Sequence, residues 1–149
     1  MTAKLNHLSS TPAPQIAISR LIWVAPLAMI VSTVANLGLY TAAGTLFPEV
    51  TAWQGAGSGQ IIGANIIYLL IATVIFAVIN WRSSQPIRHY WIVATVGLIL
   101  SFWMPISAGL SFGPPEAVPA SVITVITLCL MHLMSYIISV PMFVRLGQK

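Results

Sequence analysis

The sequence carries one histidine near the middle of its last long apolar stretch. Residues 119–144 read PASVITVITLCLMHLMSYIISVPMFV, and the histidine is His132. Inside a membrane an imidazole can relay protons, bind haem or a metal, or contact a quinone or a small lipid. It can also bridge helices as a neutral hydrogen-bonding group, and we favour this role because one imidazole has few chemical partners. On a helix that turns about 100° per residue, four small polar side chains and one leucine share its sector: Ser121, Thr124, Leu128, Ser135 and Ser139.

Three more polar residues come at a similar depth in the other apolar stretches. Counting about 1.5 Å per residue places Asn36, Asn65 and Ser101 near the depth of His132 when the stretches alternate in direction. An unpaired amide or imidazole is costly in hydrocarbon, so we expect these side chains to hydrogen-bond to one another. The sequence therefore predicts a binding or structural polar cluster of Asn36, Asn65, Ser101 and His132. It predicts no catalytic residue and no metal site, because no nucleophile–base pair and no set of metal ligands is visible.

Four apolar stretches have to position this cluster. They cover about residues 20–43, 60–80, 90–110 and 119–144, and each is long enough to cross a hydrocarbon core of about 30 Å. We predict an all-α integral membrane four-helix bundle in residues 19–145, after a polar cytoplasmic tail in residues 1–18. Pro48 and Glu49 favour a short helical turn in the first outer loop. Gly97 and Ser101 form a small-xxx-small pair, which predicts a close approach of two helices.

Composition and charge support a membrane protein. Of the 149 residues 58% are hydrophobic and 5% are charged, whereas a soluble domain is about a quarter charged. In a four-span topology all six basic residues lie on one side, and Glu49 and Glu116 lie on the other. The positive-inside rule then places both termini in the cytoplasm, and we expect the chain to lie in the plasma membrane. The basic residues are Lys4, Arg20, Arg82, Arg88, Arg145 and Lys149.

The expected partners follow from the same pattern. The lipid bilayer is one, and a second copy of the chain or another membrane subunit is the other. The basic residues are scattered singly and do not form a patch, so we expect no nucleic acid.

Two classes of function remain open. The first is a structural, accessory or small-molecule-binding module built around His132. The alternative is a redox or proton-handling membrane subunit that uses His132 with haem or a quinone. Haem b generally needs two axial ligands, and His7 and His89 fall in the expected cytoplasmic tail and loop, so we predict no cofactor. An intramembrane enzyme is the least favoured class.

Three short motifs resemble a family of small bacterial four-span membrane proteins. They are STVANLGLY in the first stretch, SFWMPISAG in the third and LMHLMSYIISVP in the fourth. The resemblance covers roughly residues 18–145. The family is classed as a domain of unknown function, so the resemblance implies a multi-pass membrane protein and supplies neither a reaction nor a ligand. The residues on matching positions are Asn36, Ser101, Pro105, Met131 and His132.

Overall fold

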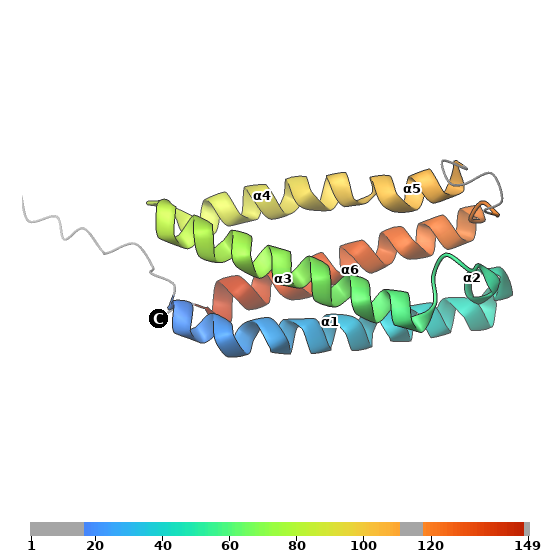
Figure 1. The fold of residues 1–149 in the computed structure, drawn as a ribbon, viewed down its shortest axis with the longest axis horizontal. Coiled ribbons are helices and arrows are strands. Elements are labelled where there is room, and N and C mark those ends of the chain that lie inside the picture. Colours follow the sequence, from blue (N-terminus) through green and yellow to red (C-terminus); the bar gives the residue numbers. More distant parts are fainter. Residues whose placement is uncertain (1–16, 111–117, 148–149) are drawn as a thin grey trace, which may run out of the picture.

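The computed structural model describes residues 17–110 and 118–147, and these residues fold into six helices. Four long rods result, because α4 and α5 continue one another across Phe102 (Figure 1). All four rods are long and apolar enough to cross a membrane, which confirms the predicted all-α membrane bundle. The short turn predicted at Pro48 is α2. The helices are α1 (Ile18–Leu46), α2 (Pro48–Ala52), α3 (Ser58–Arg82), α4 (Pro86–Ser101), α5 (Trp103–Gly109) and α6 (Val122–Leu146).

The first three rods begin two to four residues before the predicted apolar stretches, whereas α6 begins at Val122, three residues after the predicted start. The third rod begins at Pro86, where a proline at the first helical position loses no hydrogen bond. The same rod is interrupted after Ser101. Pro105 has no N–H for the carbonyl of Ser101, and its ring crowds that carbonyl, so a new helix starts at Trp103.

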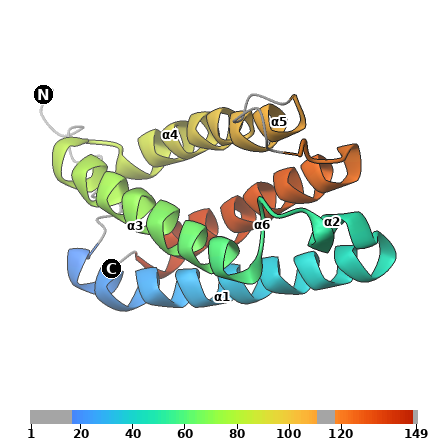
Figure 2. The ribbon, with the colours of Figure 1, turned by 45° about the vertical axis from the view of Figure 1, so that its right-hand side comes forward.

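The four rods form a ring in the order α1, α3, α4–α5, α6. Helix α1 packs against α3 and α6, and α4 packs against the same two helices. The backbone N–H of Ala17 donates to the carbonyl of Gly147 at 3.0 Å, so the two ends of the described chain lie together. We name this the terminal end of the bundle. The opposite end, which carries α2, is the loop end (Figure 2).

The antiparallel pair of α1 and α6 is set by a register of matching small and polar residues. Asn36 lies opposite Ser135, and the same register puts Tyr40 opposite Met131, one turn further along, in a shared core cluster. On α1 the small residues Ala25, Ala28 and Ser32 are at most 5% exposed. Their size lets the two backbones approach closely. The buried side of α6 consequently runs through Met131, and His132 is turned toward the remaining two rods.

The bundle is closed at the terminal end and open at the loop end. At the terminal end the rings of Phe76, Tyr90 and Phe143 pack against one another at tilted or edge-on angles, with centroids 4.2–6.1 Å apart, in a core to which all four rods contribute. The core at the loop end takes side chains from α1, α2, α3 and α6, and none from α4 or α5. Figure 1 shows the result: α3 and α4 meet at the terminal end and separate toward the loop end.

The outer surface of the rods is apolar, and the described charges sit at their ends. Large side chains such as Ile22, Val34 and Leu100 are 65–77% exposed, as expected for residues that contact lipid. Glu49 lies in α2 at the loop end. The described cations are at the terminal end, next to the starts of α1 and α4 and the ends of α3 and α6: Arg20, Arg82, Arg88 and Arg145.

Candidate functional site

Two amides and a hydroxyl join three of the rods near the middle of the bundle. The Nδ2 group of Asn36 donates to Asn65 Oδ1 at 3.2 Å and to Ser135 Oγ at 2.8 Å. Ser135 Oγ in turn donates to Asn65 Oδ1 at 3.0 Å. Asn65 Nδ2 donates to the carbonyl of Ile61 at 3.0 Å, one turn back on its own helix. We call Asn36, Asn65 and Ser135 the amide triad; it ties α1 to α3 and α6.

The triad leaves one acceptor unused. Asn36 Oδ1 is enclosed without a hydrogen-bond partner among the described residues, and so is Ser32 Oγ one turn earlier on α1. Each buried, unpaired polar atom of this kind costs about 1–3 kcal/mol. The packing of the helices alone therefore does not explain why a polar group lies at the centre of the bundle.

The other two residues of the predicted cluster lie beside the triad without bonding to it. Ser101 Oγ donates to the carbonyl of Leu98 at 2.7 Å, within its own helix. His132 makes no hydrogen bond to a described residue, and its ring nitrogens are not among the enclosed unpaired atoms. Ser135, three residues after His132, contacts Asn36 instead. It was visible in the sequence as a member of the same helical sector.

Two aromatic rings flank the imidazole of His132. The centroid of Tyr68 on α3 is 6.3 Å away, with the ring planes at 53°. Phe102, between α4 and α5, is 6.5 Å away at 71°. The imidazole is thus half-buried between two different rods, with its polar edge unoccupied by protein.

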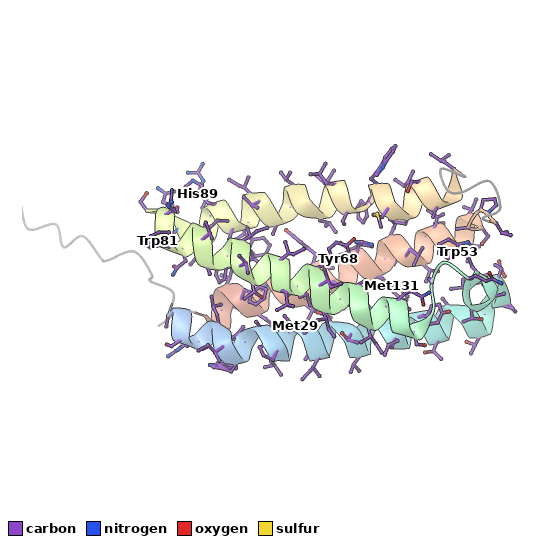
Figure 3. The ribbon with its side chains drawn as sticks, viewed as in Figure 1. Met29, Trp53, Tyr68, Trp81, His89 and Met131 are labelled. Carbon is purple, nitrogen blue, oxygen red and sulfur yellow. The ribbon has the colours of Figure 1, made fainter. Side chains whose placement is uncertain are left out.

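His132 lies where two cavities meet. One, of about 320 Å³, runs toward the terminal end, and the other, of about 470 Å³, runs toward the loop end. We call them the terminal arm and the loop arm, and we call the two adjoining cavities together the lateral cleft between α3 and α4–α5. Figure 3 shows Tyr68 in the gap between these rods. Four residues line both arms: Ala64, Tyr68, Leu128 and His132.

Small residues on α4 widen the cleft. Gly97 and Ser101 line the terminal arm, and a Cβ built on Gly97 would meet no atom within 4 Å. The close helix contact that this pair predicted is therefore absent, and an open space occupies its place. The rim is exposed to the membrane, since Tyr68, Ile71 and Val93 are 41–50% exposed.

The other described histidine, His89, lies far from His132. His89 sits at the turn between α3 and α4, where its ring bonds to Ser83 Oγ at 2.5 Å. Figure 3 places His89 with Trp81 at the end of the bundle opposite Trp53, far from the middle of α6. Within the described ranges no group of three His, Cys, Asp or Glu side chains could hold a metal ion. Glu116 and His7 lie outside the described residues.

The arrangement is suited to binding. It offers an apolar space that opens laterally and an imidazole that can donate one hydrogen bond and accept another.

A comparison of the chain with protein-family models, curated proteins and solved structures finds no match.

Proposed function

We propose that this protein is a plasma-membrane protein that binds a membrane-dissolved small molecule in the lateral cleft. The observation that carries the proposal is His132, a half-buried imidazole that has no hydrogen-bond partner among the described residues and lies where the two arms meet. Ligand sites are typically mostly apolar spaces of about 300–1,000 Å³ with a few placed polar groups. Both arms of the cleft fall in this size range.

The route to the site supports the same proposal. The rod Pro86–Gly109 is the least buried of the four, with 6% of its apolar window inside the bundle against 22–33% for the others. Because it joins the shared core only at the terminal end, a molecule dissolved in the bilayer can reach His132 sideways, without passing through water.

Native mass spectrometry of protein extracted from its own membrane tests the proposal. We expect the wild type to carry a bound small molecule and Gly97→Leu, which fills the terminal arm, to lose it. Gly38→Leu is the matched control, because a Cβ at Gly38 also meets nothing within 4 Å and this residue is exposed on α1. Wild-type protein without any bound molecule, or Gly97→Leu with unchanged occupancy, would refute the proposal.

A redox subunit is the second candidate. It is favoured by Tyr68 and Phe102, whose rings stand beside the imidazole where a quinone head could hydrogen-bond. Extraction and quantification of quinones from wild type and His132→Leu tests this version. A Soret band that His132→Ala abolishes would instead support haem.

We also propose that the terminal end faces the cytoplasm. The support is electrostatic: the described cations gather there, and basic flanks are retained on the cytoplasmic side. Single cysteines at Ser84 and Gln54, both exposed at opposite ends of the bundle, are introduced after Cys129→Ser. A membrane-impermeant maleimide added to intact cells should label Gln54→Cys and spare Ser84→Cys, and the reverse pattern would overturn this orientation.

A further inference from the structure

The two arms of the cleft differ in what lines them and in how they end. The terminal arm is lined on its α3 and α4 walls by aliphatic side chains such as Ile71, Ile75 and Val93. Polar side chains line its inner wall as well, among them Asn65, Ser135 and Tyr136. Ser135 Oγ donates to Asn65 Oδ1 at 3.0 Å, and the Tyr136 hydroxyl is bonded to Thr95 Oγ1 at 2.7 Å, so these groups are already hydrogen-bonded within the protein. The arm therefore offers a surface that suits hydrocarbon.

The terminal arm is blind. At its far end Tyr90 lies against Phe76 and Phe143, and both phenylalanines are fully buried at 0% exposure. A polar headgroup could not pass this aromatic plug toward the terminal end, whereas the end of an alkyl chain can rest against it at no cost in lost hydrogen bonds.

The loop arm is larger and more polar. Trp53, Gln60 and the loop residues Gly55 and Pro119 line it, close to the depth at which lipid headgroups meet water. The Trp53 indole N–H donates to the carbonyl of Val118 at 2.9 Å, which ties the loop before α3 to the segment before α6. A headgroup in this arm keeps access to the membrane surface.

We propose that the cleft binds a single-chain acyl amphiphile, with the chain end in the terminal arm, the carbonyl linkage at His132 and the polar head in the loop arm. This inference rests on the proposed binding function and names its ligand class. The neutral imidazole N–H donates to the ester or amide carbonyl. From Ser101 to Tyr90 the arm follows α4 for about 16 Å at 1.5 Å per residue, which suits most of an extended palmitoyl chain.

Photocrosslinking with monopalmitoylglycerol in nanodiscs tests the ligand class and its direction. One probe carries a diazirine at the chain end, and a second carries it next to the ester. We expect the first to label Ile75 or Val93 and the second to label Tyr68 or Met104. Excess unlabelled monopalmitoylglycerol should reduce this labelling several-fold and leave labelling of the outward-facing Val34 unchanged.

The outcomes separate the ligand class from the proposed function. Which residues each of the two probes labels can be measured on the wild-type protein, without any substitution. Gly97→Leu should also suppress cleft labelling while Gly38→Leu preserves it. A reversed order, or cleft labelling that excess lipid does not reduce, overturns the acyl inference. If native mass spectrometry still finds a different molecule whose binding Gly97→Leu abolishes, the proposed function stands and only its ligand class is wrong.

Discussion

The amide triad predicts which residue pairs across α1 and α6 are energetically coupled. Asn36 Nδ2 lies 2.8 Å from Ser135 Oγ, whereas no hydrogen bond joins Asn36 to His132. Hydrogen bonds between membrane helices contribute about 0.6 kcal/mol on average and at most about 1.7. We therefore expect a coupling energy of about 0.6–1.7 kcal/mol in the double-mutant cycle of Asn36→Leu with Ser135→Ala. The cycle of Asn36→Leu with His132→Leu should be additive within about 0.5 kcal/mol.

The single substitutions are less diagnostic than the cycle. Asn36→Leu loses two hydrogen bonds but also removes Oδ1, which is enclosed without a partner. Losing the bonds costs about 0.6 kcal/mol each, while relieving an unpaired acceptor returns about 1–3 kcal/mol. The two effects have opposite signs, and their sum runs from almost no change to a gain of about 2 kcal/mol in the free energy of unfolding. We expect Asn65→Leu to lower the free energy of unfolding, in contrast to Asn36→Leu, because the hydroxyl of Ser135 loses its acceptor.

The measurement is reversible unfolding in mixed micelles with increasing SDS, followed by far-UV circular dichroism. The His132 cycle is the matched control, because it uses the same Asn36 substitution and a residue one turn from Ser135. Additive changes in stability for Asn36 and Ser135, or a coupling of similar size for Asn36 and His132, would refute the hydrogen bonding of the amide triad.

Three further substitutions test the packing around the cleft and the loop. Gly97→Ala should raise the free energy of unfolding by about 0.5–1 kcal/mol, since its Cβ enters open space; a loss would show that the helices pack there. Gly109→Ala should lack this gain in the same SDS titration, because its Cβ would lie 2.8 Å from Val125 Cγ2. Tyr40→Phe removes the donor that the carbonyl of Ala56 accepts at 2.7 Å and should cost about 1–3 kcal/mol. Faster proteolysis of the loop that contains Ala56 would confirm this loss of stability, and an unchanged rate of proteolysis would contradict it.

The sequence predicts the rods well because their signal is local. A run of apolar residues long enough for the bilayer needs no knowledge of its neighbours, and all four runs are helices. The sequence predicts the third stretch as one helix and does not predict the break after Ser101, although the missing N–H of Pro105 accounts for this break once it is seen. Depth also comes from counting along one helix, and this is why Asn36 and Asn65 are brought together as expected.

The rotation of a helix about its own axis depends on the neighbouring helices, so the sequence does not predict it. Whether Ser135 or His132 faces Asn36 depends on how α1 docks on α6, which the small residues Ala28 and Ser32 allow. A small-xxx-small pair such as Gly97 and Ser101 permits close approach, but the rest of the bundle decides whether a helix comes near. The core at the loop end forms without α4, so this pair lines a space.

The pairing of α1 with α6 also constrains how the protein is made. Asn36 and Ser135 are 99 residues apart, and a ribosome adds about 5–20 residues per second. A nascent chain therefore has to keep the first helix for roughly 5–20 s before its partner emerges, with an amide that lipid solvates poorly. During that interval Asn65, which lies 29 residues after Asn36, is the partner that can bond to its amide, and the bundle can consolidate only after α6 has been made.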